Sequence, residues 1–260
     1  MLFRSLAPCS TSPSVVAEPA GRIRVGEWFQ GPTGSGQGGW SAHRLRLAAG
    51  RPVTVAIRAP IPVERDLEIV DAPGDDGWWL VDPAGPATPV LEAAPWTPDV
   101  PDTDPVGIVD AALAGRRFPY ADPHPVPHCF SCGNQPDSMQ VHAGPLDDRR
   151  WATDWTVPWW AVKPDGTVDE GALWAAIDCT QAWYVGKGNS GEHGVTVQLA
   201  VEVVLPLVAG ASYALVAWAG DYPAGWDGRK RGACGAVFDE DRKSTRLNSS
   251  HSSVSRMPSS

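Results

Sequence analysis

The sequence has no apolar run long enough for a membrane-spanning helix, so we expect no membrane span. Its N-terminal residues also lack the continuous apolar core of a secretory signal peptide. A formal net charge of −9 and the lack of a basic stripe with interleaved aromatic residues count against a nucleic-acid partner. We therefore expect a cytoplasmic protein.

Several motifs of well-known enzymes are also missing. No Ser/His/Asp set stands in a nucleophile-elbow context, and there is no P-loop for phosphate. The glycines Gly34, Gly36 and Gly38 form too short and too poorly placed a run for a dinucleotide fingerprint. Five cysteines, an odd number spread along 260 residues, do not make a disulfide framework. We expect no cofactor.

Tryptophan and proline, in contrast, are abundant, with 13 and 26 residues. This composition favours strands with aromatic faces, separated by proline-rich turns. Ten strands are predicted, at 22–29, 52–58, 67–71, 78–82, 90–96, 140–143, 151–156, 195–205, 211–219 and 231–239. Strands that follow one helix, instead of alternating with helices, favour an α+β fold over a doubly wound sheet.

Three helices are predicted, at 40–49, 106–114 and 169–186. In the longest, Asp169 can cap the N-terminus and Gly186 can end the helix. Its residues are apolar nearly all round, which indicates a buried helix. Asp178 is the exception in its middle, and a buried carboxylate must be paired, protonated or used in chemistry.

The chain divides into five predicted segments. Residues 1–21 are a flexible lead-in, and residues 22–96 form a first unit. A proline-rich connector at 97–127 leads to a second unit at 128–241, and residues 242–260 are a serine-rich tail that looks non-native. Because the tail interrupts the pattern after Asp241, we expect the second sheet to lack its last strand. If the chain forms a homo-oligomer, exposed sheet edges would carry it.

A set of short motifs between about Arg22 and Asp241 resembles, in order and spacing, the hotdog thioesterase superfamily. Within it, the likeness is to bacterial double-hotdog proteins of the acyl-CoA thioesterase-like kind. The motifs are Phe29-Gln-Gly-Pro, Gly38-Gly39-Trp40, Cys129-Phe-Ser-Cys-Gly-Asn, His142-Ala-Gly-Pro, Leu173-Trp-Ala-Ala-Ile-Asp-Cys, Leu199-Ala-Val-Glu-Val and Asp227-Gly-Arg-Lys. Gln37 departs from the pattern, since such proteins commonly have Asn before the paired glycines.

The resemblance implies two hotdog units, each an antiparallel sheet wrapped around a central helix, with the active site between them. It implies hydrolysis of acyl-CoA or another acyl thioester, with an acidic residue on a central helix activating water or attacking the carbonyl. Asp178 would take that role, the amides of Gly38 and Gly39 would hold the oxyanion, and Gln181 would position water. A dehydratase is disfavoured, because no histidine lies between Asp169 and Gly186.

Each of these residues also has a structural interpretation. Asp178 can make a structural hydrogen bond between the two units, and Gly38 and Gly39 can simply allow a tight turn and close packing. Gln181 can contact a neighbouring strand, and His43 can lie in the interface or at the surface. The alternative function is a non-catalytic hotdog protein that binds acyl-CoA or serves a structural role.

Cys129 and Cys132 raise the question of zinc, because thiolates at this spacing, with histidines nearby, are common ligands. A complementary Cys-x-x-Cys pair is missing, and Cys179 and Cys234 lie far along the chain. A simple turn capped by Gly133-Asn134 explains the pair as well. We expect no metal.

Overall fold

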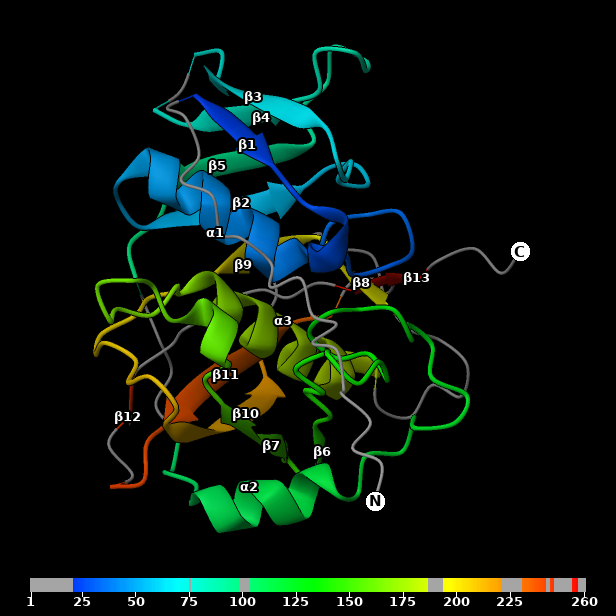
Figure 1. Cartoon of the computed structure of the whole chain (residues 1–260), viewed down its shortest axis with the longest axis vertical. Helices are drawn as coiled ribbons and strands as arrows, with labels where there is room; N and C mark the ends of the chain where they lie inside the picture. Colours follow the sequence, from blue (N-terminus) through cyan, green and yellow to red (C-terminus); the bar gives the residue numbers. More distant parts are fainter. Residues whose placement is uncertain are drawn as a thin grey trace, which may run out of the picture.

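The computed structural model describes residues 21–74, 76–98, 103–186, 194–220 and 231–241, together with short strands at 244–245 and 254–256. Two antiparallel sheets enclose two packed helices (Figure 1). From one side of the molecule to the other, the layers are the first sheet, α1 (Gly38–Ala49), α3 (Gly171–Gly186), the second sheet and α2 (Ile108–Gly115). The predicted α+β architecture of two hotdog units is confirmed.

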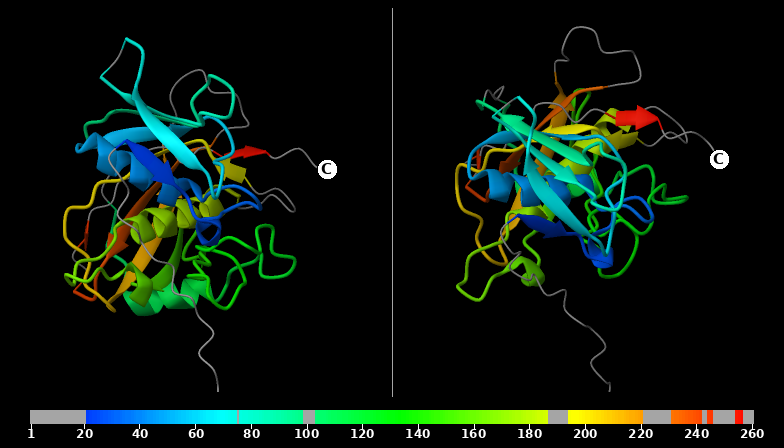
Figure 2. Two further views of the ribbon diagram at one scale, coloured as in Figure 1. Left: turned by 45° about the horizontal axis from the view of Figure 1, so that its top comes forward. Right: turned by 90° about the horizontal axis from the view of Figure 1, so that it is seen from above.

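The first sheet has the strand order β1-β3-β4-β5-β2-β9, and α1 packs on it. Figure 2 shows this sheet from above, with α1 beneath it. Its last strand comes from the second half of the chain, because Leu199 pairs with Val55. The strands are β1 (Arg22–Arg24), β2 (Val53–Ile57), β3 (Asp66–Asp71), β4 (Trp78–Val81), β5 (Leu91–Pro95) and β9 (Gln198–Ala200).

The second sheet has the order β12-β11-β10-β7-β6 and lies between two helices. α3 packs on one face, and α2 covers the other with its small buried residues Ala111 and Ala114. The strands are β6 (Gly144–Pro145), β7 (Arg150–Thr156), β10 (Ser212–Ala219), β11 (Ala233–Phe238) and β12 (Ser244–Thr245). A separate pair joins β8 (Gly194–Thr196) to β13 (Val254–Arg256).

The ends of α1 follow from its flanking residues. The side chain of Gln37 caps the N-terminus by accepting a 2.7 Å hydrogen bond from the Trp40 amide. Gly50 ends the helix in the left-handed conformation, with φ of 66°, which costs glycine little. α1 therefore starts directly after Gln37, at the paired glycines.

α3 is buried almost all round, as its sequence predicts. At its start the Asp169 carboxylate accepts from the Gly171 amide at 2.9 Å and from Arg44 of α1 at 2.7 Å. Arg44 also lies 3.9 Å above the ring of Trp40. A capping carboxylate and a buried ion pair thus join the two central helices at one end.

An aromatic cluster joins the two halves beside this helix pair. Phe29 stacks on Trp40 at 3.9 Å between ring centroids, and Phe130 and Trp160 from the second half contact both rings edge-on. Phe29 belongs to the short 3-10 helix η1 (Glu27–Phe29), and Trp160 to a second one, η2 (Trp159–Ala161). Part of the unusual tryptophan content therefore serves packing between the halves.

The predicted helices and most of the strands are present, but two predicted strands are wrong in part and a third is absent. The strand at 22–29 ends at Arg24, because the chain turns into η1. The segment 140–143 is not a strand, and pairing begins at β6. The segment 195–205 splits into β8 and β9, because β8 pairs with β13 and β9 pairs with β2, and residues 201–205 join no sheet.

The sequence predicts that the serine-rich segment 242–260 is a non-native tail. The structure describes two short strands in it, β12 at the edge of the second sheet and β13 beside β8. The division of the chain into a lead-in, two units, a connector and a tail stays a prediction. No helix among the described residues is both long and apolar enough to cross a membrane.

Candidate active site

The carboxylate of Asp178 lies where α3 meets the start of α1 and the end of β8. Its Oδ2 accepts hydrogen bonds from the side-chain amide of Gln37 at 2.7 Å and from the Gly39 amide at 2.9 Å. Its Oδ1 accepts from the hydroxyl of Thr196. Asp178 is thus held by both halves of the chain, at the junction that the sequence predicts for a site.

Burial dominates the electrostatics of this carboxylate. Asp178 is only 3% exposed, and this desolvation raises its pKa to about 6, although the hydrogen bonds from Thr196, Gly39 and Gln37 act in the opposite direction. A carboxylate with a pKa near neutrality can take up a proton and release it again under ordinary conditions.

The paired glycines are required by the close approach of α1 and α3. A Cβ atom on Gly39 would lie 2.2 Å from the carbonyl oxygen of Trp174. A Cβ atom on Gly38 would lie 2.9 Å from Cδ1 of Ile57 and 3.1 Å from Oδ2 of Asp178. Both glycines thus allow the close packing that was their structural interpretation. The Gly39 amide also donates a hydrogen bond to Asp178.

Gln181 lies on the side of α3 that faces the second sheet. It is fully buried, and a Cβ atom on Gly235 of β11 would lie 2.8 Å from its side-chain nitrogen. This position agrees with the structural interpretation of Gln181, a contact to a neighbouring strand. Its suggested part in positioning water stays a prediction.

Two residues that hold Asp178 were not predicted. In the sequence Gln37 is only a departure from the family pattern, whereas in the structure it both caps α1 and contacts Asp178. Its place directly before two glycines and a tryptophan was the available signal for the cap. Thr196 was missed because its contact to α3 is formed by tertiary packing, and no local pattern indicates it.

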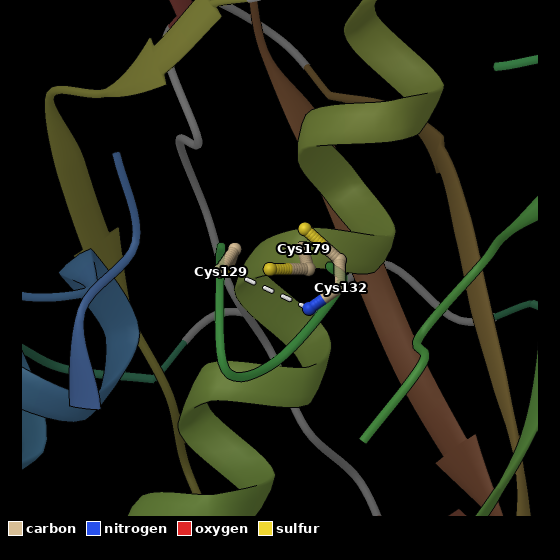
Figure 3. Close-up of side chains that lie close together, drawn as sticks. All are labelled: Cys129, Cys132 and Cys179. Carbon is tan, nitrogen blue, oxygen red and sulfur yellow. Dashed lines mark hydrogen bonds between the residues drawn. The ribbon is translucent and has the colours of Figure 1, made fainter. Parts of the chain in front are cut away.

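A second cluster adjoins this site and consists of three cysteines (Figure 3). The Sγ atoms of Cys129, Cys132 and Cys179 lie within 4.8 Å of one another, and all three residues are buried. Hydrogen bonds from the Cys132 and Cys179 thiols hold the pKa of Cys129 well below its ordinary value. Cys179 lies far from the Cys-x-x-Cys pair in the sequence, but α3 brings its sulfur atom next to theirs.

The histidines near the pair do not join this cluster among the described residues. The ring of His142 stacks on Phe118 at 4.6 Å between centroids, and its Nε2 lies 3.1 Å from the Cys132 carbonyl oxygen. His43 lies elsewhere, buried between α1 and the start of α3, where desolvation lowers its pKa to about 3. Its ring therefore stays neutral at physiological pH.

The comparisons with known proteins rest on structure alone. No family model matches the sequence, and neither does any curated protein. A solved structure assigned as an oleoyl thioesterase of Lactobacillus plantarum is 9% identical, with a TM-score of 0.54, and the match covers 92% of this chain and 96% of that one. The chain has the double-hotdog fold.

A second double-hotdog match is the TesB protein of Mycobacterium avium subs paratuberculosis. It is 14% identical, with a TM-score of 0.51, and the match covers 94% of this chain and 91% of that one. Coverage of both chains nearly end to end shows that both hotdog units take part. At this identity the likeness shows the fold, and the chemistry must be argued from the residues in the site.

Proposed function

We propose that the protein hydrolyses an acyl thioester, with Asp178 as the general base that activates water. The observation that carries the proposal is the buried carboxylate held by donors from both hotdog units. A carboxylate offers about four lone-pair positions, and three are occupied here, which leaves one for a water molecule. Thr196 is only half-buried, so its side of the carboxylate is nearest to solvent.

The proposed reaction proceeds by addition and elimination. Asp178 takes a proton from water while the water oxygen bonds to the thioester carbon, and the carbonyl oxygen becomes an oxyanion. When the carbon–sulfur bond breaks, the thiolate leaves and takes up the proton that Asp178 holds. The products are a carboxylic acid and a thiol, and Asp178 returns to its ionised form.

The oxyanion requires donors that the carboxylate does not already use. The Gly39 amide donates to Asp178 and the Trp40 amide donates to Gln37, whereas the Gly38 amide, the first of α1, has no acceptor among the described residues. A helix N-terminus favours negative charge. We therefore assign the oxyanion contact to Gly38 first, and to Gly39 only if substrate displaces its bond to Asp178.

The competing function is a non-catalytic hotdog protein that binds acyl-CoA. The observation in its favour is that Asp178 is nearly inaccessible and already has three donors, as a structural group would. The sequence also contains a short basic cluster, Arg229, Lys230 and Arg231, that could bind the phosphates of CoA, and the structure describes only Arg231 of it. Its guanidinium donates to the carbonyl of Val185 at 3.0 Å, at the end of α3.

The test is thiol release from a panel of acyl-CoAs and from acyl N-acetylcysteamine thioesters, which lack the nucleotide. We expect release by the wild type and a loss of about 100-fold or more in Asp178→Asn, since a positioned base contributes roughly 10²–10⁴-fold. Asp154→Asn, which changes an exposed carboxylate on β7, is the matched control and should keep full activity. Equal release by the Asp178→Asn protein would exclude Asp178 as the base, and no release by the wild type from any substrate would leave the binding function as the better assignment.

A further inference from the structure

We propose that Cys129, Cys132 and Cys179 bind one thiophilic d10 metal ion, Zn²⁺ or Cu⁺, which ties the turn at 129–133 to α3. The proposal is independent of thioester hydrolysis, since neither Asp178 nor any other residue of that site is a ligand. It rests on the geometry of the three sulfur atoms, on the turn that carries two of them and on their burial (Figure 3).

The three sulfur atoms are already spaced as a metal ion requires. Metal–thiolate bonds of about 2.3 Å place sulfur ligands about 4 Å apart in a trigonal or tetrahedral site. The Sγ atoms here all lie within 4.8 Å of one another. Binding needs shifts of less than about 1 Å, which changes in side-chain torsion can supply.

The turn from Cys129 to Gly133 is built in advance of any ligand. The Cys132 amide donates to Sγ of Cys129 at 3.5 Å, and the Gly133 amide donates to the Cys129 carbonyl at 2.7 Å. A Cβ atom on Gly133 would lie 2.5 Å from the carbonyl oxygens of both Pro127 and Cys129, so only glycine fits this position. An amide donor to a sulfur atom stabilises the thiolate form that a metal ion needs.

The same turn is fixed to the helix that provides the third sulfur. The hydroxyl of Ser131 donates to the Ala175 carbonyl of α3 at 2.9 Å, one helical turn before Cys179. The side-chain amide of Gln37 lies 3.6 Å from Sγ of Cys179. The three ligands therefore converge from two rigid elements, and little conformational entropy is lost when a metal ion orders them.

The chemistry of the ligand set selects the ion. Three sulfur ligands favour thiophilic ions over Mg²⁺ or Ca²⁺, which take oxygen ligands. Among the described residues no carboxylate, histidine or further cysteine joins the group as a fourth ligand. Cu⁺ is satisfied by three thiolates, whereas Zn²⁺ requires a water molecule as its fourth ligand. Binding releases the thiol protons, so affinity should rise with pH.

The experiment uses the full chain, purified with a phosphine reductant, stripped of metal and loaded anaerobically with Zn²⁺ or Cu⁺ in separate arms. After desalting, we expect one ion per chain by mass spectrometry, and with Co²⁺ as a probe we expect thiolate-to-metal charge-transfer absorption. Competition with a chromophoric chelator should show at least a tenfold loss of affinity in Cys132→Ser and in Cys179→Ser. Cys234→Ser, which changes a buried cysteine of β11 outside the cluster, should bind as the wild type does.

Three results would overturn the proposal. The first is wild-type protein that retains no ion in either arm, and the second is equal retention by Cys132→Ser, which would indicate binding elsewhere, for example by histidines. The third is a disulfide among these cysteines in the anaerobically purified protein, seen as the corresponding mass loss. If the serine variants fail to fold by circular dichroism, the charge-transfer intensity of the Co²⁺-loaded wild type decides, since absent thiolate absorption excludes the site.

Discussion

Gly39 of α1 donates its backbone amide to the carboxylate of Asp178 on α3, with 2.9 Å between nitrogen and oxygen. This bond is possible only because the two helices approach so closely that a Cβ atom at position 39 would overlap the carbonyl oxygen of Trp174. One glycine therefore sets both the packing of the central helices and the position of the carboxylate.

The first prediction concerns that close approach. Gly39→Ala should lower the free energy of unfolding by about 1–3 kcal/mol or more, because the helices must separate to admit the methyl group. Urea denaturation measures this loss. Gly26→Ala is the matched control, because Gly26 has φ of −66° and a Cβ atom there would meet its nearest neighbour at an ordinary 3.5 Å. Equal stability of the two variants would mean that the helices do not pack as described.

The second prediction concerns the hydroxyl of Thr196. Thr196→Val keeps the shape of the side chain and removes one donor to Asp178. A hydrogen bond to a charged group contributes about 1.5–3 kcal/mol, so its loss disfavours the ionised carboxylate, and below about pH 6 kcat/KM for thioester hydrolysis should fall roughly 10- to 100-fold. Thr156→Val, at an exposed position of β7, is the control and should have no effect.

The pH profile separates a catalytic role of this contact from a structural one. The proposed base works when ionised, so wild-type kcat/KM should rise with pH through about 6, where Asp178 titrates. The Thr196 hydrogen bond lowers the pKa of Asp178. Its loss in Thr196→Val should therefore move the rising limb of the pH profile to higher pH. A lower rate with an unmoved limb would indicate that Thr196 only supports the fold.

The elements that the sequence predicted well are those with local signals. α3 could be predicted because Asp169, Gly186 and an apolar surface mark its start, end and burial within one segment. Asp178 could be singled out for the same reason, as a charge in the middle of an apolar helix. The α+β arrangement followed from the order of helices and strands along the chain.

Contacts between distant segments could not be predicted in this way. β9 completes the first sheet although it comes from the second half, and strand pairing of that kind leaves no mark in a single segment. Cys179 meets Cys129 and Cys132 only because α3 packs against the turn that carries them. The contact of Thr196 with Asp178 likewise depends on where β8 ends relative to α3.

The third prediction concerns the ion pair between Arg44 and Asp169. Both side chains are buried, with N–O distances of 2.7 Å to both carboxylate oxygens. Arg44→Met removes one partner and leaves the other charge buried, which should lower the free energy of unfolding by about 3–5 kcal/mol. Arg22→Met breaks an exposed pair with Glu68 and should cost about 1 kcal/mol or less. Similar losses in the two variants, measured by urea denaturation, would contradict the buried geometry.

The fourth prediction concerns the pH dependence of stability through His43. Burial, together with the charge of Arg44, lowers the pKa of His43 from its ordinary 6.5 to about 3, while Asp169 acts in the opposite direction. The unfolded chain therefore binds a proton that the folded chain does not. The stabilising contribution of the neutral ring is present above pH 6.5 and is lost as pH falls toward 3, at up to about 1.4 kcal/mol per pH unit.

Two other groups act with the opposite sign, so the comparison must be made between two proteins. Burial raises the pKa of Asp178 and of Glu170, and these carboxyls therefore bind protons more readily in the folded chain. Subtracting the profile of His43→Gln from that of the wild type cancels their contribution. The difference in the free energy of unfolding should change by about 2–3 kcal/mol between neutral pH and about pH 4.5, with the wild type losing more. Parallel profiles would show that His43 takes up its proton in the folded protein, and hence that its ring reaches solvent.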